Sequence, residues 1–245
     1  IGYKSQQASF KSLLYQNLQS TSTNNAGENK PVAAEVGLGS RVAAITSTFT
    51  QGNLTHVENP FSVALEGDGF FQIRTESGEL QYTRDGSFEI SPVANGNMLC
   101  TSDGNPVLDA YGNQIILPSN RVATDLVVNQ DGTLAFPDGT GNPAVITDAN
   151  GRPVKFGIYQ FNNPAGLSKE GSNNYSVTVA SGAAVAENGN AAVKQTKTHQ
   201  YYTEASNVDV ANEMVNLIVA QRAYEMNSKA IQASDEMMQQ ANALR

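Results

Sequence analysis

The sequence has little of several residue types on which cross-linking, metal binding and catalysis depend. Its 245 residues include one Cys, two His and no Trp. The single Cys100 excludes an intramolecular disulfide and a cysteine metal cluster. The chain also lacks a run of about 18 apolar residues, so it predicts no membrane-spanning helix. Its first residues lack the basic, then apolar, then small-residue order of a cleavable secretion signal.

Positive charge is scarce as well. Lys and Arg total 15 against 23 for Asp and Glu, which gives a formal net charge of −8. A chain of this charge has no general attraction to nucleic acid phosphates. We therefore expect neither nucleic acid nor a membrane among its partners.

Candidates for catalytic chemistry are few. His56 and His199 are accompanied by no nucleophile motif such as G-x-S-x-G, so we interpret both as structural or surface residues. Residues 138–151 lack the regular acidic spacing of a calcium-binding EF-hand. Glu66 and Asp68 are the obvious carboxylate pair for a glycosidase, but a glycine-rich turn explains Asp68 more simply. We predict that the protein is not an enzyme and has no catalytic, cofactor-binding or metal-binding residues.

The last segment, Ala205–Arg245, carries the clearest periodic pattern. From Val208 onward it contains no Gly or Pro and is rich in residues with high helix propensity. It predicts one long C-terminal helix. Ser206 or Asn207 is expected to accept the first free backbone N–H groups, with Asp209 adding negative charge near the positive end of the helix dipole.

Apolar residues recur every seven positions in this segment, with others beside them. A seven-residue repeat is typical of a helix that packs along another helix of comparable length. We call this set the seam and predict that it forms a helix-packing contact between subunits; the simpler alternative is the last core helix of a globular protein. The seam comprises Val210, Met214, Leu217, Ile218, Tyr224, Ile231 and Met238.

The sequence pattern in the middle of the chain predicts β-strands. Short apolar or alternating runs are separated by Asp-Gly and Asn-Gly pairs, which supply the positive φ of tight hairpins. We predict a mainly β protein with a long C-terminal α-helix, in which an all-β hairpin domain, 57–179, is inserted between helical terminal segments, 1–56 and 180–245. The predicted strands are Phe61–Leu65, Phe70–Arg74, Leu80–Thr83, Ser87–Ile90, Asn97–Cys100, Gln114–Leu117, Leu126–Asn129, Thr133–Phe136, Phe156–Phe161 and Tyr175–Val179.

The first part of the chain is less regular. Within Ile1–Leu18, apolar residues such as Phe10 and Leu14 have spacings compatible with one helical face. Gln19–Lys30 is polar and predicts a flexible linker. Arg41–Thr50 is rich in β-branched residues and predicts a strand.

Four motifs resemble those of the bacterial flagellar rod and hook proteins, the axial family. Leu65–Gln72 is followed by Tyr82–Phe88, then by Asn163–Leu167 and, in the terminal segment, by Gln221–Lys229. The last of these is most like the distal rod members. The matches occur in the family's order and span most of the chain, which makes their joint occurrence specific.

A physical role can be given to the first two motifs. Gly67 and Gly69 allow a sharp turn, and Phe70 offers an aromatic anchor to the core. Asp85 and Gly86 are expected to close the following hairpin.

The resemblance implies a structural subunit of the flagellar basal-body rod, polymerising helically into the shaft that transmits torque from motor to hook. Its implied partners are copies of itself and other axial proteins, its implied location is the rod across the periplasm, and its implied export route is the flagellar type III apparatus. It also implies a long helix before Ile1 as the natural partner of the seam. The alternatives are a hook or proximal rod subunit or, from a different class, a β-rich protein that binds or degrades cell-wall carbohydrate.

Overall fold

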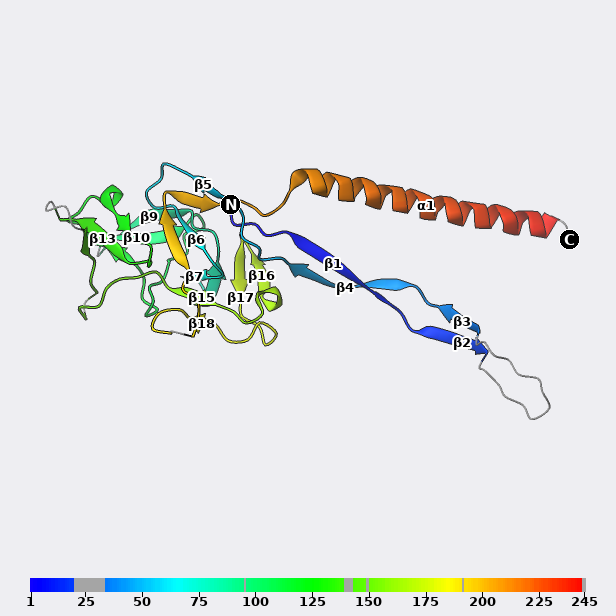
Figure 1. The fold of residues 1–245 in the computed structure, drawn as a ribbon, viewed down its shortest axis with the longest axis horizontal. Coiled ribbons are helices and arrows are strands. Elements are labelled where there is room, and N and C mark those ends of the chain that lie inside the picture. The colour runs from blue at the N-terminus through cyan, green and yellow to red at the C-terminus, as the bar shows by residue number, and fades with distance from the viewer. Residues whose placement is uncertain (20–33, 95, 139–142, 149, 191, 244–245) are drawn as a thin grey trace, which may run out of the picture. The chain divides into compact units, whose positions relative to one another are not determined.

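The computed structural model describes residues 1–19, 34–94, 96–138, 143–148, 150–190 and 192–243 (Figure 1). Apart from Gln19, the predicted linker Gln19–Lys30 lies outside these residues. The chain divides into two compact units, Ile1–Asn207 and Val208–Arg245. The first unit holds every described strand, and the second holds the α-helix.

The fold class predicted from the sequence is confirmed: the protein is mainly β with one long C-terminal helix, α1 (Val210–Ala243). Two short 3-10 helices, Ala123–Asp125 and Pro164–Gly166, interrupt the strands. The strands are β1 (Gln6–Ser12), β2 (Tyr15–Gln19), β3 (Ala34–Gly37), β4 (Ser40–Ser47), β5 (Leu54–His56), β6 (Val63–Glu66), β7 (Phe70–Arg74), β8 (Leu80–Thr83), β9 (Phe88–Val93), β10 (Gly96–Thr101), β11 (Ile116–Leu117), β12 (Val127–Val128), β13 (Leu134–Pro137), β14 (Pro143–Val145), β15 (Ile158–Gln160), β16 (Ser168–Gly171), β17 (Asn174–Ser176), β18 (Val185–Ala186), β19 (Lys197–Gln200) and β20 (Tyr202–Glu204).

The largest sheet has six strands in the order β16-β17-β8-β7-β15-β18. Two three-stranded sheets, β11-β10-β9 and β12-β13-β14, and the pairs β19-β6 and β20-β5 complete the β part of the first unit. Each pairing between neighbouring strands is antiparallel. Strands β19 and β20 come from the far end of the chain, so sequence-distant segments close this unit.

Two aromatic clusters fill the core, and β7 contributes to both because successive strand residues face opposite sides. Phe71 lies with its ring centroid 5.0 Å from that of Phe88 and 5.3 Å from that of Phe156. Phe70 lies 5.4 Å from Phe161 on the same measure and also contacts Tyr175. Both β7 phenylalanines are almost completely buried. Edge-to-face contacts of this kind add to the free energy of area burial.

Each of the ten strands predicted in the middle of the chain overlaps a strand of the structure, and the bounds of β7 and β8 are as predicted. The predicted strand Arg41–Thr50 corresponds to β4. Strands β19 and β20 were not predicted, because Lys-Thr-His-Gln and Tyr-Thr-Glu lack an apolar alternation.

The helical face predicted within Ile1–Leu18 is wrong. The backbone there is extended, and β1 pairs with β4 from Gln6 opposite Ser47 to Ser12 opposite Ser40. Pairing with a distant segment outweighs a local spacing of apolar residues that is too short to stabilise a helix by itself.

Strands β1 and β4, continued by β2 and β3, form a two-stranded ribbon that we call the arm (Figure 1, blue). Large apolar side chains of the arm are exposed; Leu14, for example, retains 86% of its accessible surface. An isolated two-stranded ribbon is marginally stable in water. The arm therefore depends on what holds its base.

Asp-Gly pairs make some of the predicted hairpins but not others. Gly132 has a φ of +80° between the paired strands β12 and β13, as the hairpin prediction requires. The prediction that Asp85 and Gly86 close a hairpin is wrong, because β8 and β9 lie in different sheets. Gly86 is instead held against the next segment: its carbonyl accepts the Val63 N–H at 2.9 Å, and a Cβ there would lie 1.7 Å from the Val63 oxygen.

Helix α1 has 34 residues and a length of about 51 Å. Asp209, not Ser206 or Asn207, provides the cap, because its carboxylate accepts the Ala211 N–H at 3.0 Å and its carbonyl accepts the Glu213 N–H at 3.0 Å. Asn207 bonds elsewhere, as described below. Within the described residues, no helix combines the length and apolar character needed to cross a membrane.

Gly86→Ala tests the close approach to Val63. Because the added methyl group would collide with the Val63 carbonyl oxygen, in a segment held to Gly86 by the Val63 N–H bond, we expect a loss of about 3 kcal/mol or more in the free energy of unfolding, measured by urea titration. The matched control is Gly78→Ala, where φ is +87° and nothing lies within 4 Å of the added Cβ. It should cost only the left-handed backbone strain, about 1 kcal/mol. Equal losses in the two variants would contradict the placement of Gly86.

Candidate functional site: a buried polar joint

Three segments that are far apart in the sequence meet in the first unit: Gly2–Ser5, Thr48–Asn53 and Glu204–Asn207. We call this assembly the joint. Backbone bonds connect its segments: Gly2 N–H donates to the Glu204 carbonyl at 3.0 Å, and Ala205 N–H donates to the Asn53 carbonyl at 2.8 Å. Side chains supply the remaining connections.

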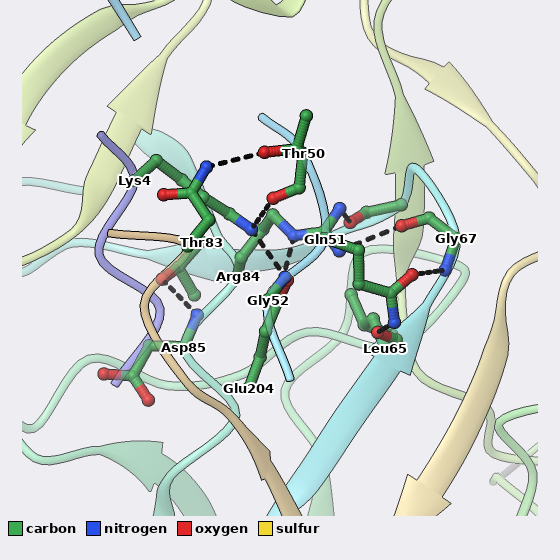
Figure 2. Close-up of polar contacts among 12 residues, drawn as sticks. Lys4, Thr50, Gln51, Gly52, Leu65, Gly67, Thr83, Arg84, Asp85 and Glu204 are labelled. Atoms are coloured by element: carbon green, nitrogen blue, oxygen red, sulfur yellow. Dashed lines mark hydrogen bonds and ion pairs between the residues drawn. The ribbon is translucent and has the colours of Figure 1, made fainter. Parts of the chain in front are cut away.

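The Glu204 carboxylate is the centre of the joint (Figure 2). Its Oε1 accepts from Lys4 Nζ at 2.7 Å and from the Gly52 N–H at 2.9 Å, and its Oε2 accepts from Arg84 Nε at 3.0 Å. Lys4 Nζ also donates to the Thr50 carbonyl at 2.8 Å. Exposed fractions are 0% for Lys4, 2% for Arg84 and 1% for Glu204. With Arg84, the joint therefore places two buried cations around one buried carboxylate.

Arg84 connects the joint to the glycine-rich turn before β7. Its two terminal nitrogens donate to the Gly69 carbonyl at 3.1 Å and the Gly67 carbonyl at 2.9 Å. The guanidinium also lies over the Phe70 ring, 5.6 Å from its centroid. A planar fork with several fixed donors can serve a carboxylate and two carbonyls at once, which an ammonium on a flexible stem does less well.

Gln51 makes a second connection to the same turn. Its amide nitrogen donates to the Leu65 carbonyl at 3.2 Å, and its amide oxygen accepts the Gly67 N–H at 3.2 Å (Figure 2). The turn is thus held from both the segment after β4 and the end of β8.

Burial and charge act in opposite directions on the ionisable groups of the joint. Burial favours the neutral form of Glu204, but the Arg84 charge and the hydrogen bonds from Lys4 and Gly52 outweigh it and leave the pKa of Glu204 below its ordinary value. Burial lowers the pKa of Lys4, and the hydrogen bond to Glu204 opposes this only in part. Removing the carboxylate would leave two cations without their counter-charge.

The structure brings the predicted motif residues together around the joint. Gly67 has a φ of +135°, a backbone conformation that favours glycine. A Cβ on Gly69 would lie 2.5 Å from Ile158 Cγ2 and 2.7 Å from Thr196 Oγ1. Asp85 Oδ1 accepts the Ser87 N–H at 2.9 Å, so this carboxylate shapes the turn after β8.

The seam residues lie in the second unit. All are exposed in the single chain, from 48% for Ile218 to 77% for Tyr224. Their packing against another helix stays a prediction.

Sequence reasoning missed Lys4, Glu204 and the true partners of Asn207. Lys4 and Glu204 are separated by 200 positions, and neither stands in a charge pattern that would distinguish it from a solvated surface residue. The only signal was the occurrence of Arg84 within the second motif, Tyr82–Phe88.

The suspected carboxylates and histidines show no catalytic arrangement. Glu66 Oε2 lies 2.7 Å from His199 Nε2 in an exposed pair, and the pKa of Glu66 is lowered mainly by this hydrogen bond. His56 stacks on Tyr201. In the part of the chain that the structure describes, no group of three or more His, Cys, Asp or Glu side chains could hold a metal ion.

Two regions of the chain match known protein families. Residues 64–136 match the family described as "Flagellar hook protein FlgE/F/G D1 domain", and residues 199–244 match "Flagellar basal body rod FlgEFG protein C-terminal". The first match contains the glycine-rich turn and Arg84, and the second contains Glu204, Asn207 and the seam. The two matches define the chain as a protein of the flagellar rod and hook class.

Relatives that match along nearly the whole chain identify the family within this class. The chain is 36% identical to the flagellar basal-body rod protein FlgG of Buchnera aphidicola subsp. Acyrthosiphon pisum, over 99% of this chain and 88% of the relative. It is 38% identical to FlgG of Borreliella burgdorferi (100% and 87%) and 34% identical to FlgG of Caulobacter vibrioides (100% and 88%). The chain therefore belongs to the family of the flagellar basal-body rod protein FlgG, the distal rod protein.

Glu204→Gln tests the joint. Loss of the buried counter-charge of Lys4 and Arg84 should lower the free energy of unfolding at pH 7 by about 3–5 kcal/mol, measured by urea titration. The exposed Glu76→Gln should change it by less than about 0.5 kcal/mol. A Glu204→Gln loss no larger than that of the control would contradict the joint.

The same pair of variants predicts a pH dependence. The pKa of Glu204 is lower in the folded than in the unfolded protein, so its stabilisation is present above the unfolded value, about 4.3, and is lost as pH falls through the folded value. Between pH 5 and pH 3, wild type should lose more stability than Glu204→Gln, which lacks this group. Parallel losses in urea titrations across that range would show that Glu204 does not titrate in this way.

Proposed function

We propose that this chain is a structural subunit of the flagellar distal rod, which polymerises helically into the shaft that transmits torque from the motor to the hook. The observation that carries the proposal is the likeness to FlgG relatives along the whole chain, together with a terminal helix whose apolar seam is exposed in the single chain. Its partners would be copies of itself and the axial proteins of the neighbouring rod and hook segments.

The terminal helix supplies the physical reason for assembly. Its seam includes Leu217, Tyr224 and Ile231, and each would release free energy on burial at about 25 cal/mol per Å² of apolar surface. An exposed apolar stripe of this length favours association over a solitary state. Contacts between different surfaces of successive copies generate a helical filament when the rotation between copies does not close into a ring.

The joint and the arm give the subunit its rigidity. The joint holds the base of the arm to the β part through the buried charges of Lys4, Arg84 and Glu204. We propose that the arm, whose large apolar side chains are exposed, contacts neighbouring subunits. We propose that stiffness arises from long helices packed along the axis together with such contacts, and that 57–179 is an inserted domain on the outside of the shaft.

The subunit would act without catalysis, cofactor or small-molecule substrate. We place it in the part of the rod that crosses the periplasm, reached through the flagellar type III export apparatus. A cell-wall carbohydrate protein is the weaker alternative, because such sites commonly present aromatic platforms. Here there is no Trp, and Phe70, Phe71, Tyr82 and Tyr175 are buried in the core. Peptidoglycan binding or turnover by the purified chain would support that alternative.

Deletion of the gene tests the proposed function. Basal bodies purified from the deletion strain and imaged by electron microscopy should show a short rod without a hook, and the wild-type gene should restore the complete structure. Complete rods that lack hooks would indicate a hook subunit instead. Normal flagella in a strain with no second copy would contradict any role in the axis.

Tyr224→Asp tests the seam. A carboxylate buried at a helix contact is costly, so the variant should fail to restore rods in the deletion strain, although helix α1 is retained by circular dichroism. Lys229→Ala, on the same helix, is the control and should restore them. Equal assembly by the two variants, counted in electron micrographs, would exclude Tyr224 from the contact.

A further inference from the structure

Asn207 is the last residue of the first unit and stands three positions before α1 begins. Its side-chain amide makes three hydrogen bonds, and none of them is with the helix. Oδ1 accepts the Ser5 N–H at 2.8 Å. Nδ2 donates to the Thr48 carbonyl at 2.9 Å and to Thr50 Oγ1 at 2.8 Å. The amide thus uses its acceptor and both of its donors.

These partners lie where the arm leaves the joint. Ser5 directly precedes β1, and Thr48 directly follows β4. The two residues are themselves connected, because the Thr48 N–H donates to the Ser5 carbonyl at 2.9 Å. Asn207 therefore binds the backbone of both strands of the ribbon at its base, between the Ser5 N–H and the Thr48 carbonyl.

The arm is long relative to this base. From Gln6 to Gln19 it spans 14 residues, which corresponds to about 45 Å of extended chain. A tilt of about 10° at the base would then move the far end by about 8 Å, more than the width of one strand. An arm that must meet a defined surface on another molecule needs its base fixed.

We propose that Asn207 is a positioning residue, whose side-chain amide clamps both strands of the arm to the segment that leads into α1. The clamp sets the direction of the arm relative to the β part of the first unit. Glu204 stabilises the joint through buried charge, whereas Asn207 restrains the arm through neutral hydrogen bonds at the partly exposed rim. This assignment concerns the single chain, so it stands or falls independently of the proposed rod function.

Amide hydrogen exchange of the full chain provides the direct readout. The Ser5 N–H donates to the Asn207 side chain, so Asn207→Ala should speed exchange at Ser5 at least tenfold. Thr50→Ala removes only one acceptor and should have a smaller effect. Asn207→Asp retains an acceptor for Ser5 but loses both donations, so it should fall between wild type and Asn207→Ala. The amides of β13, in a sheet that includes neither the arm nor the joint, should exchange as in wild type.

Arm direction is measured separately by electron spin resonance. Spin labels at Ser12 on the arm and Glu76 in the β part, both exposed, are introduced with the buried Cys100 replaced by Ala. The distance distribution should be narrow with Asn207 present and clearly broader in Asn207→Ala. The matched control is Asn188→Ala, an exposed asparagine elsewhere in the same unit, which should leave both exchange and distances unchanged.

Three results would overturn the assignment. Unchanged exchange at Ser5 would show that the Asn207 amide does not protect it. Faster exchange throughout the unit, β13 included, would indicate general destabilisation in place of positioning. An unchanged distance distribution in Asn207→Ala, with a thermal midpoint like that of Asn188→Ala, would show that other contacts set the direction of the arm.

Discussion

A carboxylate without access to water remains ionised only where cations and donors surround it, and this constraint on Glu204 organises the first unit. The hydrogen-bond partners of Glu204 are Lys4, Arg84 and the Gly52 N–H. The start of the chain, the segment after β4 and the residue after β8 therefore all contact the last residue of β20. Arg84 extends the constraint to the glycine-rich turn through the Gly67 and Gly69 carbonyls. These glycines are therefore required less for flexibility than for close approach and an unusual φ. One buried charge cluster explains why motifs far apart in the sequence belong to one structure.

Local patterns predicted the elements that depend on local chemistry. Helix α1 follows from 34 residues without Gly or Pro, and β7 and β8 follow from apolar runs beside turn residues. The errors arose where distant partners decide the outcome. Phe10 and Leu14 share a spacing that suits a helix, but pairing with β4 extends the backbone. Asparagine is a residue type that often caps helices, but the Asn207 amide forms hydrogen bonds with Ser5, Thr48 and Thr50. Asp209 caps the helix instead. Lys4 and Glu204 could not be paired from sequence, since nothing local connects residues 200 positions apart.

The two units meet different physical requirements. The β part buries its own aromatic clusters and pairs the buried charges of Lys4, Arg84 and Glu204 within one chain. Helix α1 leaves its apolar residues exposed, and we propose that it gains stability by packing against other surfaces. Such a division suits a subunit that is shaped before assembly and joined during it. The joint lies next to the helix in the sequence, because Glu204 and Asn207 stand a few residues before α1 begins.

A cryo-electron microscopy reconstruction of rods purified from the source bacterium would show both the surroundings of the seam and those of Glu204. We expect Leu217, Tyr224 and Ile231 to be buried against helices of neighbouring subunits, while Glu204 remains between Lys4 and Arg84 as in the single chain. A rod in which the seam faces solvent would contradict the role of α1 in assembly. A rod in which Glu204 has separated from both cations would contradict the claim that a joint formed within one subunit fixes its shape.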